Sequence, residues 1–147
     1  MLRRMLRARV ELRELARDWR SWCKAIAEAA EKTLGSSRVY VFGSAAEGYA
    51  TGGSDVDVLV VAGRLPRSFR LRGEIKARIE EEAGLPLYHP FEIHLATWKE
   101  AEANPIYREA IEKGKIINAQ GLDSMKPIGE SFGESRGRLP DRSLGQR

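Results

Sequence analysis

The chain has 147 residues, of which 42% are hydrophobic and 31% are charged, and its formal net charge is +4. This length predicts one soluble domain with a modest core, and it leaves no room for a second catalytic or acceptor-binding domain. No apolar stretch approaches the length of a membrane span, and residues 1–6 are too short an apolar run for a signal peptide.

The positive charge is unevenly distributed along the chain. Residues 1–24 hold eight Lys or Arg and three Asp or Glu, whereas residues 25–120 hold twelve and fourteen. A groove that follows DNA or RNA needs clustered cations, so nucleic acid is not the expected main substrate. The single cysteine, Cys23, excludes an internal disulfide, and a reducing cytoplasm is the expected compartment.

The first element expected is an amphipathic helix from about residue 6 to residue 34, ended by Gly35. Its apolar residues recur at three- and four-residue steps: Leu12, Leu15, Trp19, Trp22, Ile26 and Ala29. This stripe predicts packing against a sheet, with Cys23 buried beneath the helix. Residues 1–10 extend beyond the expected core, so they are available for a homo-oligomer or heteromer contact.

Two strand-like runs, 38–42 and 55–61, flank a glycine-rich segment, and the second run begins at two carboxylates. Side chains alternate along a strand, so Asp55 and Asp57 are expected to share one face, roughly 6 to 7 Å apart. Two like charges held together repel unless a cation lies between them. Oxygen ligands suit Mg²⁺, which commonly binds one or two protein carboxylates together with substrate phosphates.

The first run ends directly at Gly43 and Ser44, and ten residues separate Ser44 from Asp55. Ser44-Ala45-Ala46-Glu47 has the form of a capping box, which predicts that a short helix begins at Ser44. The free N–H groups at the start of such a helix bind anionic phosphate. Phosphates are therefore expected opposite the Asp55 and Asp57 pair.

A third acid is expected on the strand at residues 90–96, where apolar residues alternate with Glu92 and His94. Glu92 points away from the core, and it completes a carboxylate triad if this strand lies beside the Asp55 strand. A base near the metals would activate an attacking hydroxyl. His94 is interpreted as a structural or rim residue, and His89 has no signature.

The remaining elements are helices at 68–83, 98–103 and 105–113 and a final strand at 115–119. In the first of these helices Phe69, Ile75 and Ile79 are expected to face inward. The predicted fold class is α/β (α+β): a small mixed β-sheet flanked by helices, with one side of the sheet covered. Residues 1–120 are expected to form the domain, and 121–147 a flexible C-terminal tail, which is a second possible oligomer contact.

The pattern Gly-Ser-x₁₀-Asp-x-Asp resembles that of the DNA polymerase β-like nucleotidyltransferase superfamily, and specifically its minimal branch, the MNT proteins. The resemblance implies two divalent metals, Mg²⁺ or Mn²⁺, bound by Asp55, Asp57 and Glu92, with Glu92 also the base. It implies that Gly43 and Ser44 hold a nucleoside triphosphate, and Ser54 also matches the family's nucleotide-binding motif. Relatives often carry Arg or Lys at the position of Glu47, so triphosphate binding is expected either to be weaker here or to rely on the metal and the backbone alone.

The activity implied by this resemblance is metal-dependent transfer of a nucleoside monophosphate, AMP from ATP, to an acceptor hydroxyl. The chain is similar to the antitoxin half of HEPN–MNT toxin–antitoxin pairs, in which members transfer AMP to a tyrosine of the toxin. A HEPN-type helical protein is thus the implied partner, and no membrane is involved. Two alternatives remain: a binding module that neutralises its partner by contact, and transfer to a small-molecule hydroxyl as in aminoglycoside nucleotidyltransferases.

Overall fold

A computed structural model of the chain describes residues 2–43, 55–118 and 121–122. The elements in chain order are α1 (Leu2–Arg17), α2 (Trp19–Leu34), β1 (Ser37–Phe42), β2 (Val56–Ala62), α3 (Phe69–Glu82), β3 (Phe91–Thr97), α4 (Trp98–Ala103), α5 (Pro105–Lys113), β4 (Lys115–Asn118) and β5 (Gly121–Leu122). The short helix predicted to begin at Ser44 lies outside the described residues.

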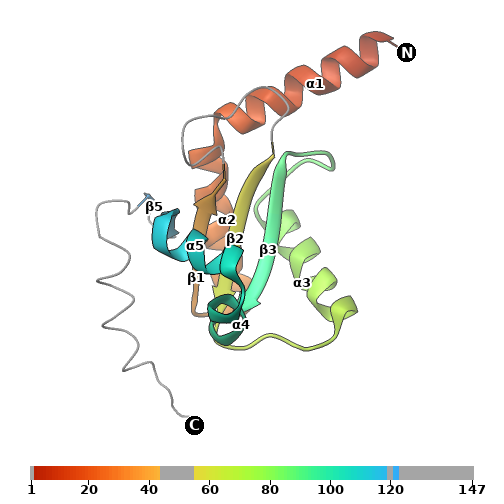
Figure 1. The fold of residues 1–147 in the computed structure, drawn as a ribbon. Coiled ribbons are helices and arrows are strands. Elements are labelled where there is room, and N and C mark those ends of the chain that lie inside the picture. The colour runs from red at the N-terminus through yellow and green to blue at the C-terminus, as the bar shows by residue number, and fades with distance from the viewer. Residues whose placement is uncertain (1, 44–54, 119–120, 123–147) are drawn as a thin grey trace.

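The strands form one mixed sheet in the order β3-β2-β1-β4-β5, as drawn in Figure 1. β2 and β3 are parallel, and the other neighbouring pairs are antiparallel. The predicted mixed sheet is therefore confirmed, and the predicted neighbourhood of the Asp55 and Glu92 strands with it. Gly121 and Leu122, which the sequence analysis assigned to the tail, pair with β4.

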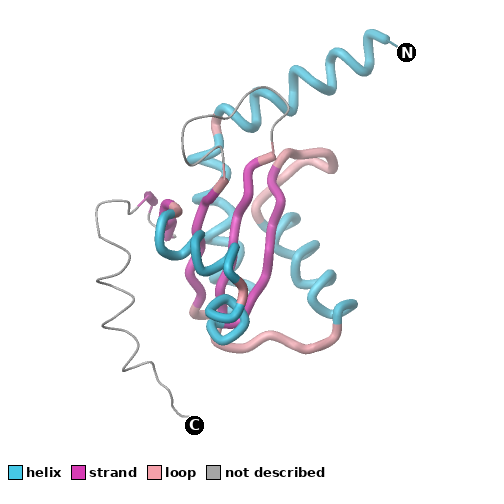
Figure 2. Tube along the Cα trace, viewed as in Figure 1, coloured by secondary structure: helices cyan, strands magenta, loops and turns pink. Residues whose placement is uncertain are grey.

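Helices cover both faces of the sheet, so the expectation of one covered side is wrong (Figures 1 and 2). On one face Val56, Val58 and Val60 pack with residues of α2 and α3. On the other face Leu59 and Val61 pack with residues of α4 and α5. A strand buried on both faces is apolar almost throughout, and such a run has no alternation from which covered and open faces could be distinguished.

The predicted N-terminal helix is two helices, because Asp18 interrupts it with φ −95° and ψ 36°. That ψ is far from the value of about −42° in an α-helix. α2 carries buried residues, including Cys23 and Ile26, whereas α1 projects away from the sheet (Figure 1). The apolar periodicity continues through Asp18, so the sequence pattern did not reveal the break. Among the described residues no helix combines the length and apolar character needed to cross a membrane.

α3 and α5 each begin after a residue whose side chain caps the first turn of the helix. Ser68 Oγ accepts a hydrogen bond from Leu71 N at the start of α3, and Asn104 Oδ1 accepts one from Ile106 N at the start of α5. Phe69, however, is 93% exposed, which corrects its inward assignment. At 3.6 residues per turn Phe69 lies about 120° around the helix from Ile75, so the two side chains cannot share one buried stripe.

Candidate active site

The candidate acids of β2 and β3, Asp57 and Glu92, lie on the sheet face that α4 and α5 cover. Asp57 is the register partner of Glu92 across the parallel β2–β3 pair. Asp57 shares a face of β2 with Leu59, and Glu92 shares the same face of the sheet with Ala96. The predicted approach of Glu92 to the Asp-x-Asp strand is thereby realised in the backbone.

The three predicted metal ligands lie where solvent or substrate can reach them. Asp55 directly precedes β2 and is exposed, as is Glu92, while the Asp57 side chain is 34% exposed. Within the described parts of the chain, no group of three or more His, Cys, Asp and Glu residues is arranged to hold a metal ion. For the three carboxylates to surround one ion, the side chains of these neighbouring acids must therefore rotate.

Gly43, at the end of β1, approaches the Asp57 carboxylate more closely than any other residue type could. Its φ is +80°, and a Cβ added there would lie 2.7 Å from Asp57 Oδ2. Both observations favour glycine, because L side chains rarely adopt this φ and because a Cβ would force the Asp57 carboxylate to move. Gly43 thus brings the end of β1 directly beside Asp57. Ser44 and Ser54, the other predicted nucleotide contacts, lie outside the described residues.

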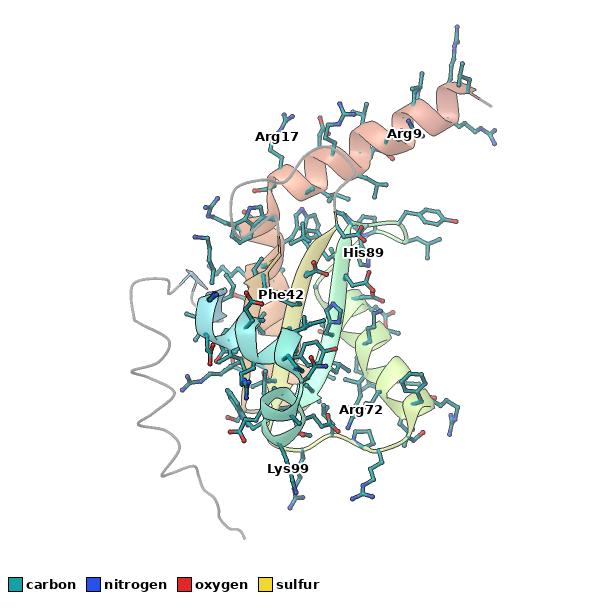
Figure 3. All side chains as sticks on the ribbon, viewed as in Figure 1. Arg9, Arg17, Phe42, Arg72, His89 and Lys99 are labelled. Atoms are coloured by element: carbon teal, nitrogen blue, oxygen red, sulfur yellow. The ribbon has the colours of Figure 1, made fainter. Side chains whose placement is uncertain are left out.

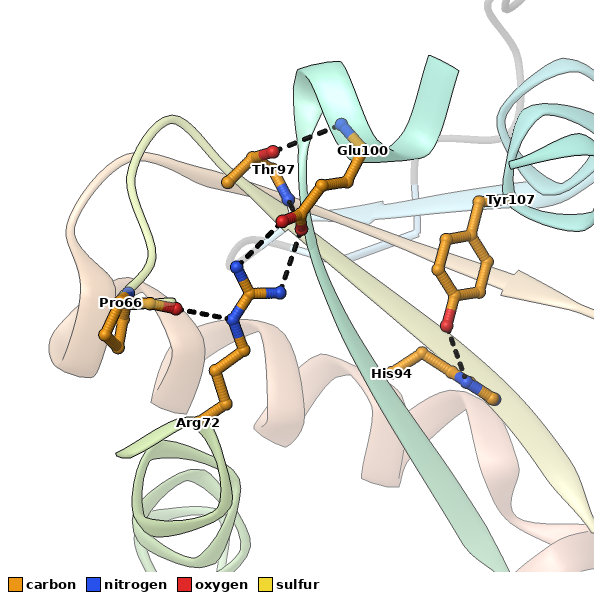
Figure 4. Close-up of polar contacts among 6 residues, drawn as sticks. All are labelled: Pro66, Arg72, His94, Thr97, Glu100 and Tyr107. Atoms are coloured by element: carbon orange, nitrogen blue, oxygen red, sulfur yellow. Dashed lines mark hydrogen bonds and ion pairs between the residues drawn. The ribbon is translucent and has the colours of Figure 1, made fainter. Parts of the chain in front are cut away.

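His94 joins the Asp57 carboxylate to Tyr107, a connection that the sequence analysis did not identify. His94 Nε2 lies 3.4 Å from Asp57 Oδ1. On the other side of the ring, His94 Nδ1 lies 3.2 Å from the Tyr107 hydroxyl, the contact drawn in Figure 4. Burial, and then the charge of Glu100, raise the pKa of Tyr107, so its hydroxyl stays protonated and can donate to Nδ1. The Nε2–H of that tautomer then points to Asp57.

Phe42 and Tyr107 enclose the His94 ring. The ring centroids of both residues lie 5.6 Å from the centroid of His94. Of the two interpretations, structural or rim residue, these contacts favour the structural one, because the His94 ring packs against two aromatic side chains and lies near a candidate metal ligand. Its place two residues after Glu92 on an alternating strand was the available sequence signal.

His89, which had no sequence signature, has a structural role before β3 (Figure 3). Phe91 N donates a hydrogen bond to His89 Nδ1, and His89 Nε2 lies 3.1 Å from Glu80 Oε2. Since Nδ1 accepts, Nε2 carries the hydrogen that points to Glu80. The imidazole therefore ties the end of α3 to the first residue of the Glu92 strand.

A second polar connection links α3 to α4. Arg72 donates through Nη1 and Nη2 to the two carboxylate oxygens of Glu100, each at 2.9 Å, and through Nε to the Pro66 carbonyl (Figure 4). Glu100 also closes the capping box of α4, where it accepts from Thr97 N. The hydrogen bonds from Arg72, then those from Thr97, lower the pKa of Glu100 to about 2.

Replacing Glu100 with glutamine is expected to reduce the free energy of unfolding at pH 7 by about 0.5–1 kcal/mol, a modest loss because the carboxylate is partly exposed and screened. The folded-state pKa lies below that of the unfolded chain, so this stabilisation is present above pH 4.5 and is lost as the pH falls through about 2. Urea unfolding of both proteins between pH 7 and pH 2 measures the difference. Glu102→Gln on the same helix is the control, and a difference that stays constant with pH contradicts the assignment.

Two solved structures are among those to which the chain is similar. The crystal structure of a candidate nucleotidyltransferase from Sulfolobus solfataricus is 19% identical and covers 68% of this chain and 79% of that chain, with a TM-score of 0.45. The crystal structure of a second candidate nucleotidyltransferase is 32% identical and covers 55% of this chain and 84% of that chain, with a TM-score of 0.39. No curated protein matches the chain.

A family model described as a nucleotidyltransferase domain matches residues 23–117. The matched segment runs from α2 into β4, so it includes the whole of β1, β2 and β3. It also contains Gly43 and the acids Asp55, Asp57 and Glu92. The chain therefore belongs to the nucleotidyltransferase domain family, and it is a nucleotidyltransferase.

Proposed function

We propose that this nucleotidyltransferase transfers AMP from ATP to a hydroxyl group of an acceptor protein, and that Asp55, Asp57 and Glu92 hold the Mg²⁺ ions that the reaction needs. The observation that supports this most strongly is the register of β2 and β3, in which Asp57 lies directly opposite Glu92. Directly opposed positions on neighbouring strands have Cβ atoms about 5 Å apart, within reach of a shared cation.

The chemistry of these side chains suits Mg²⁺ or Mn²⁺. All three candidate ligands supply carboxylate oxygens, the ligand type that these hard cations prefer. Gly43, which comes close to Asp57 Oδ2, places no side chain of its own beside that oxygen. Bound metal would stabilise negative charge on the attacking and leaving oxygens.

Glu92 and His94 would have different roles in the reaction. Glu92 accepts the proton of the acceptor hydroxyl, whose oxygen then forms a bond to the α-phosphorus of ATP. The bond from that phosphorus to the bridging oxygen breaks, and pyrophosphate leaves. His94 orients the Asp57 carboxylate through one oxygen, as the second partner of a metal ligand commonly does.

The nucleotide would bind at the turn after β1, with Gly43, Ser44 and Ser54 as its contacts. Of these only Gly43 is among the described residues, and its place beside Asp57 supports the assignment. We take the acceptor to be a HEPN-type helical protein and the role of this chain to be that of an antitoxin in the cytoplasm. Both statements are proposals that follow from the sequence resemblance.

The first step is to determine whether the adjacent gene encodes a small helical HEPN-type protein. The test then combines that protein with the full chain, ATP and Mg²⁺. Intact-mass spectrometry is expected to show one or more AMP masses added to that protein, and none when the metal is chelated. ATP with Mg²⁺ or Mn²⁺ is also expected to raise the melting temperature, because a ligand that binds only the folded state stabilises it. A partner that forms a tight complex but keeps its mass would favour neutralisation by contact instead.

A further inference from the structure

A cleft of about 960 Å³ follows the outer edge of β3, the last strand of the sheet. Three consecutive residues of that strand line it: Ile93, His94 and Leu95. Successive side chains on a strand point to opposite faces, so a cavity that touches all three must lie along the edge of the strand. The volume is at the upper end of the range for binding pockets, and the cleft is open to solvent.

Two helices from opposite faces of the sheet form its walls. α3 contributes Phe69, Arg72 and Lys76, and α4 contributes Lys99 and Glu100. The Arg72–Glu100 pair joins the two walls, and Figure 3 shows Arg72 between α3 and α4 and Lys99 projecting from α4. The cleft is therefore a built feature of the fold, held by a bidentate ion pair.

The cleft is positively charged, although residues 25–120 as a whole have an excess of acids. Besides Arg72 it is lined by three further cations: Arg67, Lys76 and Lys99. None of these three has an ion-pair partner in the described part of the chain. The lining contains one carboxylate, Glu100, and Arg72 already neutralises it. Such a cleft attracts an anionic ligand.

The cleft also reaches the candidate active site. His94 and Tyr107 line its near end, and His94 contacts Asp57 on the neighbouring strand. A ligand that lies along β3 and contacts His94 would therefore be separated from the Asp57 carboxylate by the His94 side chain.

We propose that this β3-edge cleft binds an extended acidic segment of the acceptor protein, which adds to β3 as a further strand and brings its hydroxyl to Asp57. The assignment of this segment as the acceptor rests on the proposed function. Acidic side chains would pair with Lys76, Lys99 and Arg67. A polypeptide is favoured over a nucleic acid because an edge strand offers main-chain N–H and C=O groups, which an added strand pairs with.

The binding test uses the full chain and a fluorescein-labelled peptide of about ten residues, rich in Glu and Asp, with one central Tyr. Fluorescence anisotropy is expected to show binding that weakens as salt is added. The Lys76→Glu/Lys99→Glu variant is expected to bind about tenfold or more weakly. The matched control is Arg78→Glu/Arg108→Glu, which makes the same change of net charge at exposed positions of α3 and α5 outside the cleft lining, and it is expected to bind as the wild type does.

The strand-addition part is tested with the same peptide N-methylated at alternate backbone positions. This peptide keeps every charge but lacks half of its N–H donors, and about tenfold weaker binding is expected. Melting temperatures of all variants verify that they fold. Equal losses in the two charge-reversed variants overturn the cleft assignment, and unchanged affinity of the N-methylated peptide overturns strand addition. Tighter binding of a single-stranded RNA of similar length, with the same dependence on Lys76 and Lys99, overturns the peptide proposal.

Failure of the cleft proposal can be distinguished from failure of the proposed AMP transfer. Asp57→Asn is expected to leave peptide affinity within about twofold of the wild type while it removes AMP transfer. If the wild type binds the peptide but transfers AMP neither to the peptide nor to the partner, the acceptor role of the cleft and the proposed function are overturned together. Transfer to the partner that is unaffected by Lys76→Glu/Lys99→Glu overturns the cleft proposal alone.

Discussion

Asp57→Asn is expected to lower the rate of AMP transfer by about a thousandfold or more, while the protein remains folded. Asn keeps the shape of the side chain but removes the negative charge that a divalent cation requires. The Asp57 side chain is 34% exposed and its contact with His94 Nε2 is long, at 3.4 Å, so little packing depends on its charge. The measurement is single-turnover transfer at saturating Mg²⁺ and ATP.

The control for this substitution is Glu102→Gln, which removes one carboxylate from an exposed position of α4. It is expected to leave the transfer rate unchanged. If Asp57→Asn retains more than about a tenth of the wild-type rate, the carboxylate is no metal ligand. Glu92→Gln is then the decisive second variant, since Glu92 would be left as the acid on which the reaction depends.

Gly43→Ala is expected to lower the transfer rate by about 10- to 100-fold, with a loss of roughly 1–2 kcal/mol in the free energy of unfolding. The stability loss comes from the φ of +80°, which a Cβ makes unfavourable. The rate loss comes from the new methyl group, 2.7 Å from Asp57 Oδ2, which must push the carboxylate aside. The flexible end of Asp57 can move at little cost in stability, but a displaced ligand is costly for catalysis.

Gly35→Ala separates the two effects. Gly35 has the same φ of +80°, and a Cβ added there meets no atom within 4 Å. Its substitution is expected to cost similar stability in urea unfolding and to leave the transfer rate unchanged. Equal activity of the two alanine variants would show that the contact between Gly43 and Asp57 has no catalytic importance.

Much of the fold was predictable because its signals are local. Ser68 and Asn104 cap the starts of α3 and α5 through hydrogen bonds to nearby backbone groups, and both helices lie where the sequence predicted them, at 68–83 and 105–113. The strand of Glu92 was likewise predicted from its alternation, which any half-buried strand shows. Cys23 is buried, as predicted, and burial raises its pKa to about 12.

The wrong predictions concern properties that do not show in any local pattern of the sequence. The break at Asp18 leaves the apolar spacing unchanged, so one helix was expected where there are two. The second covered face of the sheet could not be read from β2, because a strand apolar on both sides looks the same whichever face a helix covers. Phe69 was assigned inward by its type, although its angular position on α3 turns it outward.

The sequence by itself determined the family, the mixed sheet and the identity of the candidate acids, because Gly43, Asp55 and Asp57 lie within one short motif and Glu92 on one alternating strand. The tertiary structure alone decided what lies beside them. It brought His94 and Tyr107 to Asp57, and it gathered Arg67, Lys76 and Lys99 into one cleft. These neighbours come from separate elements, and only the packing of α3, α4 and α5 around the edge of β3 makes them adjacent.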